Sequence, residues 1–304
     1  MRRSSASRTT YRLLPAADLV VDLAQVIISG ILLGGVYALF AAGLNLIFGV
    51  MRVINLGHGE LMMLGAYTTF WLFTKADVNP LLSLPASAAI MFVLGVGIQR
   101  VLVERVVNQP LLSSLLLTFG LSTLFMGVAL NLWTANFRSV PYLTGSVSFG
   151  GLAFSRSRLI AFAIAVAITG ATYAFLRFST FGKAIRATSQ HAEVAQVCGI
   201  NVRRVRLITF GIGSAMAAVA GSLIAMIFTI SPEMGRMFIG KAFAIIVLGG
   251  LGSFVGALLG AVLLGVAETL AAYYTDTQLA QGVSYAILVG VLLLRPAGFL
   301  GRSE

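Results

Sequence analysis

The chain has 304 residues, of which 58% are hydrophobic and only 10% are charged. Soluble domains carry about 25% charged residues, so this composition predicts an all-α bundle of helices that cross a membrane several times. The net charge of +11 is spread between apolar runs, which argues against nucleic-acid binding and favours contact with a lipid bilayer. One cysteine and two distant histidines predict neither a disulfide nor a metal site.

The first segment, residues 1–24, is basic and rich in Ser and Thr, and a long apolar run follows it from about Leu23. A signal peptide would end its short apolar region with small residues at a cleavage site, and none follows here. We therefore expect an N-terminal polar extension over 1–24 and a transmembrane domain over 25–304.

Apolar runs that could cross, or nearly cross, ~30 Å of hydrocarbon follow one another along the chain. They are Val26–Phe48, Glu60–Phe73, Leu82–Val103, Leu111–Trp133, Leu159–Phe178, Leu207–Ile230, Phe238–Leu251, Phe254–Ala272 and Ala280–Leu294. Glu60–Phe73 and Phe238–Leu251 are too short for a comfortable full span, and each adjoins a glycine-rich break. One lies in each half of the chain, which is typical of broken helices near a transport path. We predict about eight or nine membrane segments.

Basic loops set the expected orientation, because short cytoplasmic loops accumulate Lys and Arg. The loops at 100–105 and 178–206 should be cytoplasmic, and the interval 133–159 should lie outside. Counting back from Arg100 then places the basic N-terminus outside if residues 60–73 cross fully. Either Glu60–Phe73 is re-entrant, or Leu44–Ile54 is an additional crossing, or the N-terminus departs from the rule.

Glycines spaced four apart predict close helix packing. The sets Gly30/Gly34 and Gly252/Gly256/Gly260 would place small residues on one helix face, as would Ala217 and Gly221. Ordinary packing is sufficient to explain each of them.

One stretch resembles a nucleotide-binding loop and is rejected. Gly235 to Lys241 matches the glycine and lysine spacing of a P-loop, but Ala242 stands where Ser or Thr must hold magnesium. No strand precedes it, and the chain has no nucleophile elbow or clustered carboxylates. We therefore expect no catalytic residues and no enzymatic activity in this chain.

Polar residues inside apolar runs are few. Asn45, Asn55, His58 and Glu60 are predicted to form a polar patch beside a translocation path, because ionisable groups at membrane depth are costly. The alternative is a capping Glu and a histidine that satisfies a neighbouring helix. Farther on, Glu268 is expected in an interfacial belt with Tyr273, Tyr274 and Asp276. Glu233 is expected in an external turn, with 231–236 forming an external loop.

The interval 181–206 is the longest polar stretch. It is predicted to fold as two short helices over 184–189 and 192–198. Gly199 would end the second helix in a left-handed conformation, and Asn201 would cap the next. A solvated basic loop that only sets topology is the simpler alternative.

Four blocks in the right order carry a family resemblance. They are GGVYALFAAGLNLIFGVMRVINLGHGELMMLGAY (34–67), GKAIRATSQHAEVAQVCGINVRRVRLITFGIGSAMAAVAGSL (182–223), GKAFAIIVLGGLGSFVGALLGAVLLGVAE (240–268) and LRPAGFLG (294–301). Together they resemble the branched-chain amino-acid permease family of ABC importers, the LivH type, over roughly residues 27–302.

The resemblance implies a multi-pass permease subunit of the bacterial inner membrane. It implies pairing with a second homologous permease, two cytoplasmic ATPase subunits that bind ATP and Mg, and an external substrate-binding protein. We expect this chain itself to bind no cofactor. The loop would couple to an ATPase through Lys183, Arg186, Glu193, Ala195, Gly199 and Ile200.

Substrates of this family and its close relatives include branched-chain amino acids, urea, short amides and small carboxylates. A stand-alone ion-coupled secondary transporter remains the alternative, and it would need titratable or sodium-coordinating groups at membrane depth.

Overall fold

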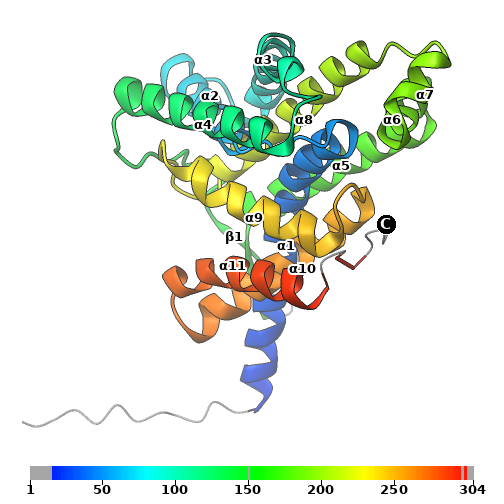
Figure 1. The fold of residues 1–304 in the computed structure, drawn as a ribbon. Helices are drawn as coiled ribbons and strands as arrows, with labels where there is room; N and C mark the ends of the chain where they lie inside the picture. The colour runs from blue at the N-terminus through cyan, green and yellow to red at the C-terminus, as the bar shows by residue number, and fades with distance from the viewer. Residues whose placement is uncertain (1–15, 150, 296–297, 300–304) are drawn as a thin grey trace, which may run out of the picture.

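The computed structural model describes residues 16–149, 151–295 and 298–299 (Figure 1). Within these ranges the chain is almost entirely helical, with one short 3-10 helix and one two-stranded β-hairpin. The helices are α1 (Ala16–Met51), α2 (His58–Ala76), α3 (Pro80–Val101), α4 (Leu111–Trp133), α5 (Arg156–Phe178), α6 (Thr180–Gln190), α7 (Ala192–Val197), α8 (Val202–Ala225), α9 (Met234–Gly249), α10 (Phe254–Tyr274) and α11 (Thr277–Leu294). The strands are β1 (Ser146–Phe149) and β2 (Leu152–Ser155), paired antiparallel.

The predicted all-α membrane bundle is confirmed. Six helices in the described part of the chain are long and apolar enough to cross a membrane, namely α1, α3, α4, α5, α8 and α10. The apolar stretch of α11 is shorter, and α2 and α9 add two further segments. Each predicted run coincides largely with one of these nine helices. The run Leu207–Ile230 extends past its helix, because α8 stops at Ala225 and the chain turns.

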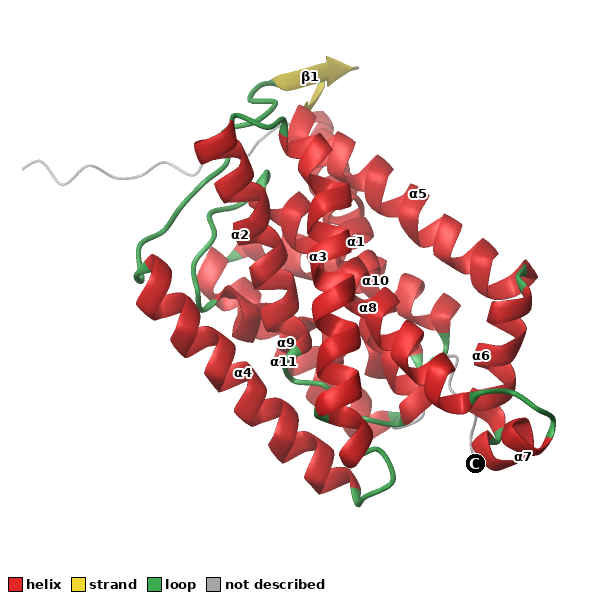
Figure 2. Cartoon of the chain, turned by 90° about the horizontal axis from the view of Figure 1, so that it is seen from above, coloured by secondary structure: helices red, strands yellow, loops and turns green. Residues whose placement is uncertain are grey.

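The two ends of the bundle differ in charge. Figure 2 shows β1 at one end, the hairpin side, and α6 and α7 at the opposite end. Basic residues at the α6–α7 end include Arg52, Arg100, Arg105, Arg177, Lys183, Arg186, Arg203, Arg204 and Arg206. Those described at the hairpin side include Lys75, Arg138, Arg156 and Arg158. By the positive-inside rule the α6–α7 end is expected to face the cytoplasm, and it is called the cytoplasmic side from here on. The β-hairpin itself was not predicted.

Helix α1 enters from the hairpin side. The backbone N–H of Ala153 in β2 donates to the side-chain oxygen of Gln25 at 3.3 Å. Residues 44–51 simply continue α1, so an additional crossing over Leu44–Ile54 is wrong. The described start of α1 therefore lies on the less basic side of the bundle. Of the three alternatives, the one that fits is an N-terminus that departs from the positive-inside rule. Of the expected 1–24 extension, residues 1–15 lie outside the described residues, and α1 begins at Ala16.

Small residues allow the central helices to approach closely. A Cβ atom on Gly34 of α1 would lie 2.8 Å from the carbonyl oxygen of Ala261 in α10. Gly221 of α8 meets the backbone of Met62 and Ala66 in α2 in the same way. Because lipid gives helices no hydrophobic reason to associate, such close backbone packing is a main source of bundle stability.

We expect Gly221→Val to prevent stable folding. Its side chain would collide with the Met62 backbone, and overpacking costs about 1–3 kcal/mol even where side chains can yield. Gly170→Val in α5 is the matched control, because nothing lies within 4 Å of its Cβ position. Thermal stability in detergent should fall for the first variant alone. Equal melting temperatures would contradict the packing described here.

Candidate functional site

Helix α2 begins about half-way across the bundle. A ring nitrogen of its first residue, His58, lies 3.2 Å from the Phe40 carbonyl oxygen, and a Cβ on Gly43 would lie 3.4 Å from the His58 ring. The same Cβ would lie 2.8 Å from the carbonyl oxygen of Gly213. Gly213 stands near the middle of α8, and at 1.5 Å per residue each end of that helix is roughly 16–18 Å away.

Helix α9 begins at the same depth. A Cβ atom on Gly59 would lie only 2.8 Å from the carbonyl carbon of Gly235, so the first turns of α2 and α9 touch. The two N-termini therefore meet near the middle of the bundle. Gly235 and Arg236 were expected in an external loop, and that expectation is wrong, because the chain turns back into the bundle after α8.

From this meeting point the two helices run in opposite directions. Helix α2 leads to the hairpin side, where the Arg138 guanidinium lies 5.1 Å from the centre of the Trp71 ring. Helix α9 leads to the cytoplasmic side, where the turn after it is fixed by a 2.8 Å hydrogen bond from the Gly252 N–H to the Asn45 side chain.

The helices around them repeat with inverted topology. In α1–α4 and again in α8–α11, a full crossing is followed by a return to mid-depth, a half-crossing helix and two further crossings. The second set runs opposite to the first, and α1 packs on α10 as α8 packs on α3. Inverted repeats with broken helices near the midplane are the usual frame of solute sites in transporters.

Glu60 lies at the meeting point, in the first turn of α2. Its side chain is fully buried, and one carboxylate oxygen accepts a 3.0 Å hydrogen bond from the Ser122 hydroxyl of α4. The other oxygen has no hydrogen-bond partner among the described residues. A Cβ on Gly235 would lie 2.7 Å from that oxygen, so the carboxylate faces the N-terminus of α9. Both helix dipoles favour a negative charge here.

Two more predicted residues join Glu60. Asn55 and His58 are fully buried, and neither the Asn55 amide nor His58 Nδ1 has a partner in the described structure. Thr118 fixes the preceding loop through a 2.8 Å hydrogen bond to the Ile54 carbonyl. Buried polar atoms are nearly always paired, so these unpaired atoms mark the meeting point as a candidate binding site.

Asn45 is not part of this cluster. Its side chain is buried and bonds the Gly252 backbone toward the cytoplasmic end of α1. The geometry therefore groups Asn55, His58 and Glu60 and gives Asn45 a contact with the α9–α10 turn.

Arg236 was not predicted as a site residue. It follows Gly235 in the first turn of α9, and its side chain is exposed at mid-depth. A charged side chain there is costly in lipid and normally faces water or another protein surface. Its place next to Pro232 and Glu233 made the segment resemble an exposed turn, so no local signal marked its depth.

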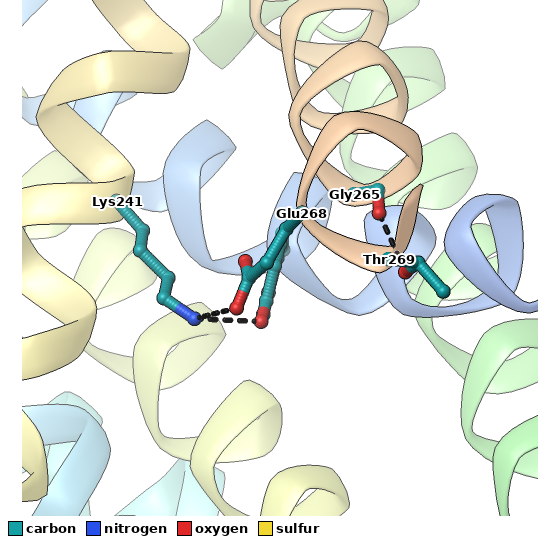
Figure 3. A network of polar contacts seen from close by, with 5 residues as sticks. Lys241, Gly265, Glu268 and Thr269 are labelled. Atoms are coloured by element: carbon teal, nitrogen blue, oxygen red, sulfur yellow. Dashed lines mark hydrogen bonds and ion pairs between the residues drawn. The ribbon is translucent and has the colours of Figure 1, made fainter. Parts of the chain in front are cut away.

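A buried ion pair lies nearby (Figure 3). Lys241 of α9 reaches Glu268 of α10 and donates a 3.0 Å hydrogen bond to the hydroxyl of Tyr37 in α1. Both charged residues are buried, at 7% and 9% exposure. The expectation that Glu268 belongs to an interfacial belt is wrong, because Lys241 holds it inside the bundle. Residues 235–241, which match the P-loop spacing, lie within the helix α9 and not in a loop.

The cytoplasmic loop folds as predicted. Ser179 caps α6 by accepting from the Gly182 N–H at 2.9 Å, and Asn201 caps α8 by accepting from the Arg204 N–H at 3.0 Å. After α7, Gly199 has φ +84°. The N–H of Ile200 bonds the Ala195 carbonyl and that of Gly199 bonds the Gln196 carbonyl, each at 3.0 Å, which completes a Schellman motif.

This folded loop has an anchored side and an exposed side. Arg186 donates to the carbonyls of Leu176 and Arg177 and so ties α6 to the end of α5, while Ala195 is buried and Ile200 packs on the core. The exposed side chains include Lys183, Glu193, Val194 and Val197. Val197 is 89% exposed, an unusual position for an apolar residue in an otherwise polar element.

An inverted repeat with two half-crossing helices is typical of multi-pass membrane transporters. The family described as "Branched-chain amino acid transport system / permease component" matches residues 26–292, and the chain belongs to that family.

Several relatives are similar to this chain over most of its length. The high-affinity branched-chain amino acid transport system permease protein LivH of Escherichia coli strain K12 is 35% identical over 92% of this chain and 96% of its own. The protein BraD of Pseudomonas aeruginosa, described in the same terms, is 33% identical with the same coverage. The permease protein LivM of E. coli is 27% identical over 87% of this chain and 68% of its own.

Proposed function

We propose that this chain is a permease subunit of a binding-protein-dependent ABC importer for branched-chain amino acids or similar small polar solutes. The family supports the transport role, and the names of its relatives support the substrate class. A homologous second permease is the expected partner, because a chain similar to LivH is also similar to LivM.

The observation that carries the proposal is the folded α6–α7 segment on the cytoplasmic side. It presents cations and two exposed valines, and it is tied to α5 by Arg186 and to α8 by the capped turn 198–201. We propose that an ATPase subunit docks on this surface. Because α8 packs against both α1 and α2, a displacement of α6–α7 would reach the mid-depth site through α8.

Energy would come from partner subunits. Two cytoplasmic ATPases would bind ATP and Mg, and an external binding protein would deliver the solute to the hairpin side. Residues 235–241 form helix α9 and offer no phosphate loop, which is consistent with hydrolysis elsewhere.

A gentle-detergent pull-down of the tagged chain tests this proposal. We expect a second permease and ATPase subunits to co-purify, identified by mass spectrometry, and the purified complex to hydrolyse ATP. Uptake in proteoliposomes should then require ATP on the side of the membrane that carries the ATPases, together with binding protein on the other side.

The second candidate is an ion-coupled transporter, because Glu60 and the Lys241–Glu268 pair place ionisable groups inside the bundle. Lys241 neutralises Glu268, which leaves Glu60 as the acid available for ion coupling. A chain that purifies alone and accumulates solute under an ion gradient without ATP would support this candidate and contradict the importer.

A further inference from the structure

The meeting point of α2 and α9 combines features that each favour a charged ligand. Both helix N-termini lack a side-chain cap, and the two partial positive charges face one another. The free carboxylate oxygen of Glu60 and the unpaired amide of Asn55 lie beside them, fully buried. Arg236 adds a full positive charge in the next position after Gly235, and its side chain is exposed at the surface of the chain.

We propose that this point is the solute-binding station and that it recognises a zwitterion, with the Arg236 guanidinium binding a carboxylate and the free oxygen of Glu60, beside the N-terminus of α9, binding an ammonium group. The inference rests on the proposed transport function and narrows it. Opposite charges on adjacent half-helices match a small α-amino acid, whereas urea and short amides carry no charge for either group to pair with.

Because the Arg236 side chain is exposed, the station lies at the surface of this chain. That surface would face either water or the second permease. An arginine at mid-depth in contact with lipid alone would be strongly unfavourable. Its neighbour Met237 is 41% exposed. The station would therefore lie at the edge of this subunit, where a solute could pass between two permeases.

A cysteine placed at position 237 tests the station in the assembled complex. In a Cys198→Ala background, the thiol introduced by Met237→Cys should react with water-soluble anionic and cationic methanethiosulfonates. Leu263→Cys is the control, because it is half-way along α10 and 51% exposed. Leucine should protect the thiol at position 237 from reaction, whereas leucinamide and isobutyramide should not.

Arg236→Gln should reduce the preference of the introduced thiol for the anionic reagent by roughly 10-fold and abolish protection by leucine. Arg236→Lys should restore the reagent preference. In uptake, Glu60→Gln should lower leucine transport about 10-fold or more, the loss expected for one charge-assisted contact.

Absence of reaction at position 237 in a complex that transports leucine would overturn the station while leaving the proposed function intact. Equal protection by leucine and leucinamide would overturn the zwitterion assignment. A wild-type complex that hydrolyses no ATP and moves no solute would instead contradict the proposed function.

Discussion

Replacing Glu268 with alanine is expected to destabilise the bundle by about 3–5 kcal/mol, one of the largest effects of any single substitution in the chain. The change would leave the Lys241 ammonium buried, with the Tyr37 hydroxyl as its hydrogen-bond partner and the Tyr37 and Phe238 rings 5.0 and 5.2 Å away. Breaking a buried ion pair by removing one partner carries this penalty, because the remaining charge has lost its compensation.

The double variant Lys241→Met with Glu268→Gln separates the ion pair from packing. Without a buried charge it should be far more stable than Glu268→Ala, since apolar replacement of a buried pair is often neutral. Tyr37→Phe removes only one hydrogen bond to a charge and should cost about 1.5–3 kcal/mol. Stability is measured by denaturant titration in detergent with an intrinsic fluorescence signal.

A Glu268→Ala variant as stable as the parent would show that Lys241 finds water or another acceptor. The pair would then be a surface contact in the assembled transporter rather than part of the core. Both residues would have to face the subunit boundary, which their burial within this chain opposes.

Most of the fold was predictable because membrane helices are encoded by local composition. Leu111–Trp133 was predicted with the same bounds as α4, since Pro110 and the polar Thr134 end its apolar run. The helix caps at Asn201 and Gly199 were also predictable from local sequence, because each depends on one residue type at one position. The short β-hairpin carries no comparable pattern.

Local composition does not predict how deep a polar side chain lies in the bundle or which side chain it pairs with. Arg236 resembles a loop residue in sequence, and its depth follows only from long-range contacts: Gly43 lies against both His58 and Gly213, and Gly59 lies against Gly235. Lys241 and Glu268 are 27 residues apart on different helices, so nothing local links them. Such pairs depend on how distant helices pack against each other, which cannot be inferred from a single sequence.

The inverted repeat explains why the two short runs occupy corresponding halves. Each full crossing, α1 and α8, is followed by a return to mid-depth, so neither α2 nor α9 needs the length of a span. Glycine at the second position of both helices then lets the N-termini touch. A single chain thereby obtains two opposed helix dipoles at one point, which no continuous span could provide.

Gly199→Pro is expected to uncouple ATP hydrolysis from transport while leaving the subunit in the membrane. Proline fixes φ near −65°, whereas this position has φ +84°, and it removes the N–H that bonds the Gln196 carbonyl. A local cost of about 3 kcal/mol would disrupt the turn between α7 and α8 in most molecules. The membrane helices do not depend on that turn for their packing.

Gly199→Asn is the matched control, because asparagine tolerates the left-handed conformation and keeps the N–H. Uptake of leucine and the stimulation of ATP hydrolysis by binding protein should fall about 10-fold or more in the proline variant and change little in the asparagine variant. Glu193→Lys should act similarly, since it places a cation in the first turn of α7, where the helix dipole disfavours it. Normal uptake by both Gly199→Pro and Glu193→Lys would mean that the ATPase docks elsewhere. The basic stretch would then set orientation alone, and motion would have to reach α8 by a route that bypasses the capped turn.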